Sequence, residues 1–347
     1  MKNILVTGGS GFIGSAYIRS FQKQDVSILN IDKNSGGIFS DIVEHDSHRN
    51  GYFHYSKIDI VNKAAVDLAI RSFNPDCIVH FAAESHVDRS IDSPEEFISS
   101  NVVGTFNLLQ SALDYYNSLK EEKRVNFKFH YISTDEVYGS IADGFFVEGD
   151  AYNPASPYAA TKAAADHIVN AWHMTYGLPV IVTHCSNNYG PYQHTEKLIP
   201  HMVFRALAGN SLPIYGDGSN VRDWLYVDDH VNALKLVLHA GVIGTNYNIA
   251  GQQEKTNTQV VTKICNILDG LVPKSTSYAE QIEYVQDRPG HDFRYAIDDS
   301  KIRTELGWCP VENFESGLLK TVEWYVSWYK KNSNVKCLAS LERQGVL

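Results

Sequence analysis

The sequence predicts an α/β fold in which a doubly wound parallel sheet carries a smaller C-terminal α/β lobe that binds substrate. In the first half of the chain, short apolar and β-branched runs alternate with stretches of helical period. Nearly continuous apolar strands separated by helices are typical of a parallel sheet that is covered on both faces. A glycine-rich turn after the first run is a second indication, because such sheets bind ligands at the carboxyl ends of their strands.

The expected elements follow one another along the first half of the chain. The β-rich runs predict strands at residues 3–8, 26–32, 77–83, 127–133 and 179–185. A further strand is expected to end at Asp59 and Ile60. Apolar residues at helical spacing predict helices over Ile13–Lys23, Ala64–Phe73, Pro94–Leu119 and Tyr158–Tyr176.

The character of the chain changes after about Asn187. Gly, Pro and Tyr become frequent and the strand-like runs become short, which favours a separate lobe. Asp228–His239 predicts a helix that returns to the first domain, and Phe314–Tyr329 predicts a final helix whose Trp324 and Trp328 pack in the core. We therefore expect a first domain of residues 1–187, rejoined by 221–243, and a second lobe of residues 188–220 and 244–347.

Composition and charge exclude several classes of function. The 347 residues carry a formal net charge of −10, which argues against non-specific binding to nucleic acid or to an anionic membrane. No apolar run is long enough to cross a membrane, and the first residues do not form a signal peptide. Five widely spaced cysteines, with Cys77 and Cys185 in apolar runs, indicate a reducing, cytoplasmic compartment. His45, His48 and His54 favour a solvated loop, and no metal is expected.

The sequence VTGGSGFIGS places Gly8, Gly11 and Gly14 between a strand and a helix. Glycine is needed there because the turn is tight and the backbone must approach a pyrophosphate at the helix N-terminus. Asp32 ends the next strand, where a carboxylate can accept hydrogen bonds from a ribose diol and repel a 2′-phosphate. Together these features predict a Rossmann-type site for NAD in preference to NADP. Two later segments are expected to line its adenine and nicotinamide sides, Asp59–Ile60 and Phe81–Ser85.

The segment YISTDEVYG begins as a buried strand and carries Thr134, Asp135 and Glu136 where the strand ends. Carboxylates are seldom buried unless they are paired or used. Tyr158 and Lys162 lie one turn apart on the same face of a helix. A nearby ammonium, helped by a positive nicotinamide ring, would lower the pKa of about 10 that a free tyrosine has. These residues indicate acid-base chemistry, and the alternatives are a solvated turn and an ordinary helix face.

Taken together, TGGSGFIG, STDEVYG and the Tyr-x-x-x-Lys helix resemble the extended short-chain dehydrogenase/reductase family. Within that family, AAESHVDRSI, CSNNYGPYQ, EKLIP, RDWLYVDDH and DRPGHDFRYAID are similar to the dTDP-glucose 4,6-dehydratases. The resemblance runs from Met1 to about Tyr325. It implies an NAD-dependent enzyme that forms dTDP-4-keto-6-deoxyglucose from dTDP-glucose with no net redox change.

The resemblance also implies a role for each residue at the catalytic end. Tyr158, supported by Lys162, would take the 4-hydroxyl proton during oxidation at carbon 4, and Thr134 would hydrogen-bond the 4-oxygen. The ketone makes the carbon 5 proton acidic, so Glu136 would remove it while Asp135 protonates the departing 6-hydroxyl. Return of hydride to carbon 6 completes the reaction. The site therefore needs one ionised carboxylate beside a protonated one.

Further binding residues are carried over from the same resemblance, position by position. The cofactor would contact Gly8, Gly11, Phe12, Ile13, Gly14, Asp32, Lys33, Asp59, Ile60, Phe81, Ala82, Ala83, Ser85, Asn101, Tyr158, Lys162 and Asn188. The substrate would contact Ser85, Thr134, Asn187, Lys197, Leu198, Pro213, Ile214, Tyr215, Arg222, Asn257, Asp287, Arg288 and His291. Arginine suits a diphosphate because it can bind bidentately. An ordinary surface ion pair is the alternative for Arg222 and Arg288.

Two segments depart from the family pattern, and other functions stay open. Asn34–Gly37 replace the usual residues after Lys33, and the segment between Gly139 and Ser156 is shorter than usual. The alternatives are a UDP-sugar 4,6-dehydratase, another nucleotide-sugar enzyme of this fold such as an epimerase or a decarboxylase, and a non-catalytic NAD-binding sensor. An epimerase has no use for the two adjacent acids, and a sensor would be free to lose the catalytic side chains. The family also implies a homodimer formed by the helices at 94–119 and 158–176.

Overall fold

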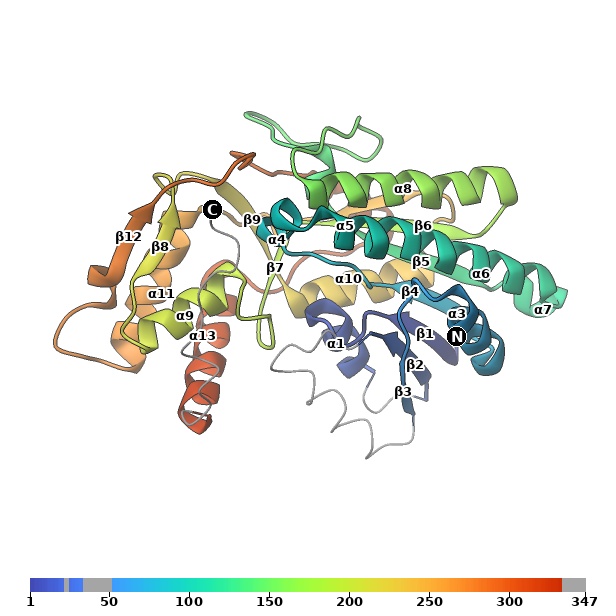
Figure 1. The fold of residues 1–347 in the computed structure, drawn as a ribbon, viewed down its shortest axis with the longest axis horizontal. Helices are drawn as coiled ribbons and strands as arrows, with labels where there is room; N and C mark the ends of the chain where they lie inside the picture. Colours follow the sequence, from blue (N-terminus) through green and yellow to red (C-terminus); the bar gives the residue numbers. More distant parts are fainter. Residues whose placement is uncertain (22–24, 34–51, 333–347) are drawn as a thin grey trace.

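The structure, a computed structural model, describes residues 1–21, 25–33 and 52–332. Its larger part is a seven-stranded sheet of order β10-β6-β5-β4-β1-β2-β3, in which every neighbouring pair is parallel (Figure 1). The strands are β1 (Asn3–Thr7), β2 (Ser27–Asp32), β3 (Phe53–Lys57), β4 (Cys77–His80), β5 (Lys128–Thr134), β6 (Val180–Cys185) and β10 (Asn246–Ile249). The prediction of a parallel α/β sheet is confirmed.

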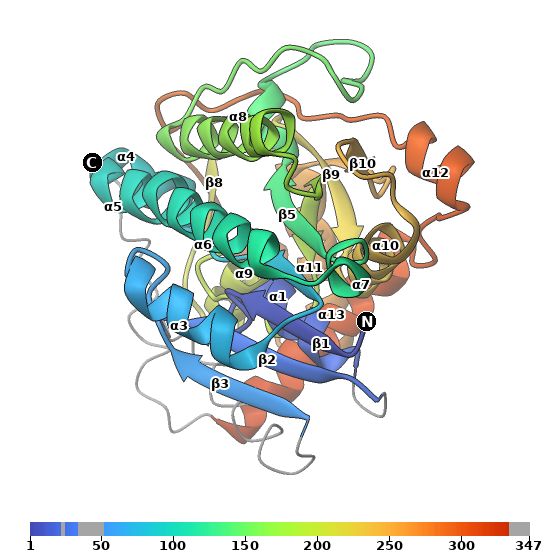
Figure 2. The same cartoon turned by 90° about the vertical axis from the view of Figure 1, so that its right-hand side faces the viewer.

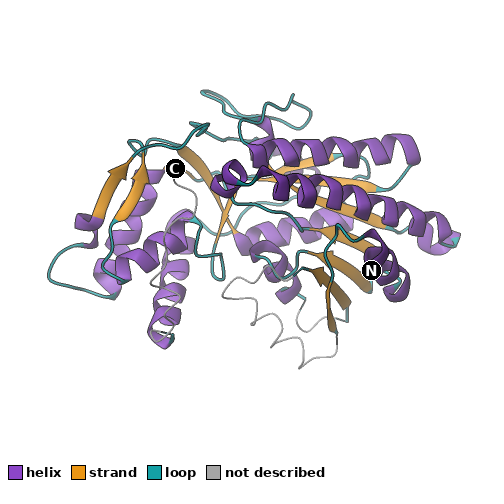
Figure 3. Ribbon diagram, in the orientation of Figure 1, coloured by secondary structure: helices purple, strands orange, loops and turns teal. Residues whose placement is uncertain are grey.

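Helices cover both faces of this sheet (Figures 2 and 3). Along β1, Leu5 packs into one apolar cluster while its neighbours Ile4 and Val6 pack into another, as alternating side chains of a strand must. The first cluster is covered by α3 (Lys63–Phe73), α6 (Thr105–Ser118) and α8 (Pro157–Tyr176). The second is covered by α1 (Phe12–Arg19), α10 (Val227–Ala240) and α12 (Ser300–Leu306).

The sequence predicts one regular helix over Pro94–Leu119, and this prediction is wrong. The segment consists of α5 (Pro94–Phe97), the π-helix η1 (Ile98–Gly104) and α6, and the short helices α4 (Val87–Asp92) and α7 (Glu121–Arg124) flank it. The π-helix carries the buried amide of Asn101, whose partners lie on other segments. An apolar period of about 3.6 residues cannot reveal an inserted turn of this kind, which is common near functional sites.

Other predicted boundaries are also shifted. Helix α1 ends at Arg19, and the strand expected to end at Asp59 and Ile60 ends at Lys57. Several predictions concern residues outside the described ranges: Lys23, Asn34–Gly37, His45, His48 and Cys337. The described cysteines Cys77, Cys185 and Cys265 are buried free thiols, and Cys309 is exposed.

The described part of the second lobe contains two small sheets and three long helices (Figure 1). One sheet has the order β11-β9-β7 and the other pairs β12 with β8. Their strands are β7 (Asn187–Tyr189), β8 (Leu212–Tyr215), β9 (Val221–Tyr226), β11 (Glu254–Thr256) and β12 (Ile282–Val285). A separate apolar core joins α9 (Leu198–Leu207), α11 (Asn257–Leu271) and α13 (Phe314–Lys331), and the 3₁₀ turn η3 (Tyr278–Gln281) borders it. Trp324 and Trp328 pack against this core, as predicted.

Two elements assigned to the second lobe by the sequence belong to the first domain. Strand β10 pairs with β6 in parallel, and α12 packs against β10. Their short runs resemble the scattered strands around them, so only the long-range pairing reveals their place. Helix α10 packs against α1 and β6. Within the described ranges, no helix combines the length and the apolarity needed to cross a bilayer.

Candidate active site

A cleft of about 900 Å³ runs along the carboxyl ends of the parallel strands. Such an edge is where open α/β sheets bind their ligands. Most predicted site residues of the first domain line it: Gly8, Gly11, Phe12, Ile13, Gly14, Asp32, Lys33, Asp59, Ile60, Phe81, Ala82, Ala83, Ser85, Thr134, Asp135, Glu136, Tyr158 and Lys162. Asn187, Asn188 and Lys197 line it where the chain enters the second lobe.

The glycine turn at one end of the cleft is too tightly packed for side chains. A Cβ atom on Gly14 would lie 2.4 Å from the carbonyl oxygen of Gly8. Gly8 itself has φ +71°, and a Cβ there would lie 2.5 Å from the backbone nitrogen of Ala82. The three glycines therefore keep side chains of their own away from the N-terminus of α1, which suits a pyrophosphate.

The carboxylate of Asp32 is held at the end of β2 beside this turn. The backbone N–H of Ser10 donates to Asp32 Oδ2 at 2.9 Å, and that of Gly9 donates to Asn30 Oδ1 at 2.9 Å. The next residue, Lys33, pairs with Glu84 at 2.5 Å. Asp32 thus lies where a ribose diol could donate to it, and these residues fit a dinucleotide with an unphosphorylated adenosine ribose.

Asn101 lies behind the cleft wall and contacts the wall from its buried side. Its Oδ1 accepts from the backbone N–H of Glu84 at 2.8 Å, and its Nδ2 donates to the Glu84 carbonyl at 3.0 Å and to Thr161 Oγ1 at 3.0 Å. The amide thereby fixes the segment that follows β4 against α8. A direct contact between Asn101 and a cofactor remains a prediction.

The predicted Tyr158 and Lys162 both lie on α8 and face the cleft. Lys162 Nζ donates to the hydroxyl of Tyr131 at 2.6 Å and to the carbonyl of Ile132 at 2.8 Å. Burial raises the pKa of Tyr158 well above its ordinary value, the Glu136 carboxylate adds to this, and a hydrogen bond with Thr134 opposes it. The prediction that Lys162, helped by a positive nicotinamide ring, lowers the pKa of Tyr158 concerns the cofactor-bound site and stays a prediction. The ammonium is engaged by β5, and the phenol is protonated in these surroundings.

Asp135 and Glu136 form the short 3₁₀ turn η2 (Asp135–Tyr138) that caps β5. The hydroxyl of Thr134 donates to Asp135 Oδ1 at 3.3 Å and accepts from the backbone N–H of Glu136 at 3.3 Å. Asp135 is 3% exposed, and its Oδ2 has no hydrogen-bond partner among the described residues. The predicted alternative of a solvated turn is wrong, since one carboxylate is buried and aimed into the cleft.

The two acids differ in their electrostatic surroundings. Burial raises the pKa of Asp135 well above its usual range, and the carboxylates of Glu136 and Asp223 raise it further. Burial also raises the pKa of Glu136, but three cations oppose the shift, in the order Arg288, Arg222 and Lys197. The surroundings thus favour a proton more strongly on Asp135 than on Glu136, and such a difference is how paired carboxyl groups come to act as acid and base.

Two arginines reach these acids from the second lobe. The buried guanidinium of Arg222 lies 4.3 Å from the ring centre of Tyr295 and donates to the Asp292 carbonyl at 2.9 Å. Arg288 Nη1 donates to Asp88 Oδ1 at 2.6 Å, and the side chain of Asp88 is only 6% exposed. Arg288 Nε is buried and has no partner within the described part of the chain. Neither arginine therefore forms the ordinary surface ion pair that was the alternative.

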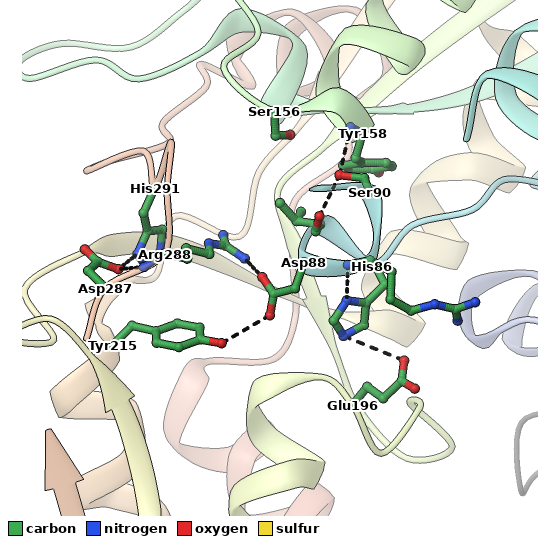
Figure 4. Close-up of polar contacts among 12 residues, drawn as sticks. His86, Asp88, Ser90, Ser156, Tyr158, Glu196, Tyr215, Asp287, Arg288 and His291 are labelled. Atoms are coloured by element: carbon green, nitrogen blue, oxygen red, sulfur yellow. Dashed lines mark hydrogen bonds and ion pairs between the residues drawn. The ribbon is translucent and has the colours of Figure 1, made fainter. Parts of the chain in front are cut away.

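The remaining predicted substrate residues lie in second-lobe elements. Lys197 donates from Nζ to the carbonyl of Ser85 at 2.7 Å, and His291 Nδ1 lies 2.7 Å from Asp287 Oδ1 (Figure 4). The others lie at the following places in the fold: Leu198 begins α9, Pro213, Ile214 and Tyr215 lie in β8, and Asn257 begins α11. Their contacts with substrate remain predictions.

Sequence reasoning missed three residues that organise the site: Tyr131, Asp88 and Ser90. Tyr131 opens the segment YISTDEVYG, and a phenol within a strand that is expected to be buried was a usable signal. Asp88 and Ser90 lie within AAESHVDRSI, three and five residues after Ser85. Among the described residues, no group of three or more His, Cys, Asp or Glu side chains is arranged to hold a metal ion.

Comparison of this chain with known proteins agrees with the resemblance seen in the sequence. Residues 5–321 match the family model described as GDP-mannose 4,6 dehydratase. The chain is 52% identical over 345 residues to dTDP-glucose 4,6-dehydratase of Salmonella typhimurium, which covers 96% of this chain and 95% of that one. The chain belongs to the dTDP-glucose 4,6-dehydratase family.

Solved structures of members of this family align with this chain over nearly its full length. The dTDP-glucose 4,6-dehydratase of Streptomyces venezuelae, whose structure holds NAD, aligns with a TM-score of 0.85 at 40% identity and covers 97% of this chain and 99% of that one. The NAD complex of the family member from Bacillus anthracis aligns with a TM-score of 0.82 at 42% identity and covers 97% of this chain and all of that one. The predicted family and fold class are confirmed.

Proposed function

We propose that the protein converts dTDP-glucose into dTDP-4-keto-6-deoxyglucose by 4,6-dehydration, with NAD as a recycled cofactor. The observation that carries this proposal is the adjacent pair Asp135 and Glu136, whose surroundings favour a proton more strongly on Asp135 than on Glu136. Dehydration needs such a pair, whereas epimerisation at carbon 4 does not. Membership of the dTDP-glucose 4,6-dehydratase family supports the same reaction.

The glycine turn and Asp32 would hold NAD. Gly8 and Gly14 let the backbone approach the pyrophosphate, and Asp32 would accept from the ribose hydroxyls. The bound cofactor supplies a hydride acceptor for carbon 4 and later a hydride donor for carbon 6. Lys33 and Glu84, which form an ion pair at the cleft wall, would flank the adenosine side.

Tyr158 is assigned the removal of the 4-hydroxyl proton. Burial and Glu136 hold the proton on its phenol, so a positive charge must be added before the phenolate can form. Lys162 and the oxidised nicotinamide ring are the two available sources of that charge. Thr134, whose hydroxyl opposes the pKa rise of Tyr158, would hydrogen-bond the sugar oxygen at the same place.

The adjacent acids are assigned the elimination. Glu136, opposed in its pKa rise by Arg288, Arg222 and Lys197, would remove the proton from carbon 5. Asp135, which burial keeps protonated, would give its proton to the leaving 6-hydroxyl. Arg222 and Arg288 would also bind the diphosphate of the substrate, since guanidinium groups bind phosphate bidentately.

The nucleotide base is the feature that an assay must decide. Thymine differs from uracil by one methyl group, which is worth about 1–3 kcal/mol in an apolar pocket. Incubation of the purified protein with dTDP-glucose, and in parallel with UDP-glucose, followed by the alkali-induced absorbance of a 4-keto sugar, tests the proposal. We expect kcat/KM for dTDP-glucose to exceed kcat/KM for UDP-glucose by roughly 10-fold or more. Product from UDP-glucose alone would favour the UDP-sugar dehydratase.

We further propose a homodimer built on the helices that precede and follow the site. Apolar side chains are exposed on η1 and α6, where Ile98 is 51%, Val103 42% and Phe106 41% exposed. Met174 and Tyr176, 82% and 53% exposed, lie at the end of the neighbouring α8. Two copies of this surface could bury one another as an antiparallel helical layer.

We also propose that the enzyme works in the cytoplasm. The buried thiols of Cys77 and Cys185 lie within core strands, and burial raises the pKa of both groups. Free buried cysteines are typical of proteins from a reducing compartment.

A further inference from the structure

The carboxylate of Asp88 lies between the two lobes and is only 5% exposed as a residue. It belongs to α4, a short helix that follows the cleft wall at residues 81–85. Both of its oxygens accept from the second lobe: Oδ1 from Arg288 Nη1 at 2.6 Å and Oδ2 from the Tyr215 hydroxyl at 3.3 Å (Figure 4). These partners come from separate segments, the loop after β12 and the end of β8.

The helix that carries Asp88 is tied to the catalytic helix. The backbone N–H of Tyr158 donates to Ser90 Oγ at 3.2 Å, and Ser90 Oγ donates to the Val87 carbonyl at 2.6 Å. Helices α4 and α8 also pack against one another. Asp88 therefore stands in a fixed relation to Tyr158, and any group bound by Asp88 is positioned relative to the oxidation site.

Arg288 connects this network to the elimination site. Among the charges near Glu136, Arg288 is the one that most opposes the rise in its pKa. One arm of the guanidinium is used on Asp88, while Nε is buried without a partner in the described chain. A guanidinium offers five N–H donors in a fixed fork, so Asp88 can orient the group and leave donors for a second anion.

We propose that Asp88 is a positioning residue: it holds Arg288 beside Glu136 and presents Arg288 and Tyr215 to the diphosphate of the substrate. The inference rests on the proposed function, because it assigns how one element of that site is set. A cationic side chain on a loop has many rotamers, and an anchor that fixes one of them reduces the entropy lost on binding. Asp88 would thus couple docking of the second lobe to the charge state of the base.

The sign of a pH effect separates positioning from a simple loss of charge. Removing the negative charge of Asp88, with Arg288 unmoved, would lower the pKa of Glu136. Releasing Arg288 removes the main opposing cation and would raise that pKa. The other ionisable groups that face Glu136 are the same in both cases: Asp135, Tyr158, Cys185, Lys197, Arg222, Asp292 and Tyr295.

The test compares Asp88→Asn with Asp92→Asn, which removes an exposed carboxylate from the same helix. The readouts are the formation of 4-keto sugar from dTDP-glucose as a function of pH and the thermal unfolding of each variant. For Asp88→Asn we expect kcat/KM to fall about 10²-fold, with the acid limb of the kcat profile moved to higher pH. Asp92→Asn should behave as the parent in both respects.

Two more variants keep the inference testable if Asp88→Asn is poorly folded. Asp88→Glu retains the charge but displaces the carboxylate by one methylene, so its acid limb should also move to higher pH, by a smaller amount. In the Arg288→Gln background, adding Asp88→Asn should change kcat/KM and the pH profile very little. The effects of two residues that act through one another are not additive.

The outcomes separate the inference from the proposed function. A parent protein that forms no 4-keto sugar from either nucleotide sugar would contradict both. A parent that turns over, with Asp88→Asn unchanged or with its acid limb moved to lower pH, would overturn the role of Asp88 alone. So would Asp88→Glu that matches the parent at every pH, since charge without geometry would then suffice.

Discussion

Lys162 Nζ donates a hydrogen bond to the hydroxyl of Tyr131 at 2.6 Å, within the wall formed by β5. The ammonium also lies 4.2 Å from the centre of the Tyr131 ring. Burial lowers the pKa of Lys162 to about 8, and the Asp166 carboxylate one turn further along α8 opposes the shift. The catalytic helix is thereby fixed to the strand that ends in the two acids.

This arrangement predicts a pH-dependent stability. The pKa of Lys162 is about 8 in the folded protein and about 10.4 in an unfolded chain. Between these values the unfolded state binds more protons, so the contribution of Lys162 to the free energy of unfolding rises with pH. Urea unfolding measures the free energy of unfolding of the parent and of Lys162→Met at each pH. The value for the parent should rise relative to that of Lys162→Met by about 1–3 kcal/mol between about pH 7.5 and about pH 10. A constant difference would show that Lys162 titrates normally.

The glycine turn predicts a specific loss of cofactor binding. A Cβ on Gly14 would lie 2.4 Å from the Gly8 carbonyl oxygen, whereas one on Gly270, in α11, would meet no atom within 4 Å. Gly14→Ala should weaken NAD binding about 10- to 100-fold by displacing the turn, at a cost of about 1–3 kcal/mol. Gly270→Ala is the matched control and should bind NAD as the parent does. Calorimetric titration measures both, and equal affinities would argue against the turn as the pyrophosphate site.

Loss of the oxidation base should stop the reaction at its first step. Tyr158→Phe keeps the ring and removes the hydroxyl, so neither enzyme-bound NADH nor 4-keto sugar should form, with a rate loss of about 10²–10⁴-fold. Tyr284→Phe removes an exposed hydroxyl from β12 and should be neutral. Tyr158→Phe that still reduces the cofactor at the parent rate would assign the base elsewhere.

The sequence predicted the site where its residues are close together in the chain or at the ends of neighbouring strands. Gly8, Asp32 and Thr134 are brought to one edge by the parallel sheet, because the carboxyl ends of all its strands meet there. The adjacent acids needed no long-range information, since their burial follows from the strand that precedes them.

The parts that could not be predicted depend on contacts between distant segments. Asp88 and Arg288 are 200 residues apart in sequence, and no local pattern indicates that they meet. No local pattern indicates that the ammonium of Lys162 donates to the hydroxyl of Tyr131, 31 residues earlier in the chain. Strand β10 resembles the strands of the second lobe and is placed in the main sheet only by its pairing with β6.

The exposed apolar surface of η1 and α6 predicts the assembly. Phe106→Glu places a charge in the proposed interface and should convert the dimer into a monomer at micromolar concentration, as measured by light scattering. Val311→Glu changes a side chain that is 83% exposed in a loop before α13 and should leave the mass unchanged. A parent protein of monomeric mass would contradict the proposed dimer.

Substitutions of the two acids should slow a later step of the reaction than Tyr158→Phe does. Asp135→Asn removes the proton donor for the leaving hydroxyl, so oxidation should proceed while product formation slows by about 10²–10⁴-fold. In the parent, burial raises the pKa of Asp135. The parent should therefore lose this acid function only as the pH rises through that raised pKa. An Asp135→Asn variant with parent activity at neutral pH would show that another group protonates the leaving oxygen.

The most direct test is a single turnover of Glu136→Gln with dTDP-glucose, followed by the near-ultraviolet absorbance of NADH. Glutamine keeps the shape of the side chain but cannot take the carbon 5 proton, so oxidation should outrun elimination. We predict that enzyme-bound NADH accumulates to nearly one equivalent and decays about 10²–10⁴-fold more slowly than in the parent. Turnover by Glu136→Gln at the parent rate, with no accumulated NADH, would contradict the assignment of Glu136 as the base for elimination.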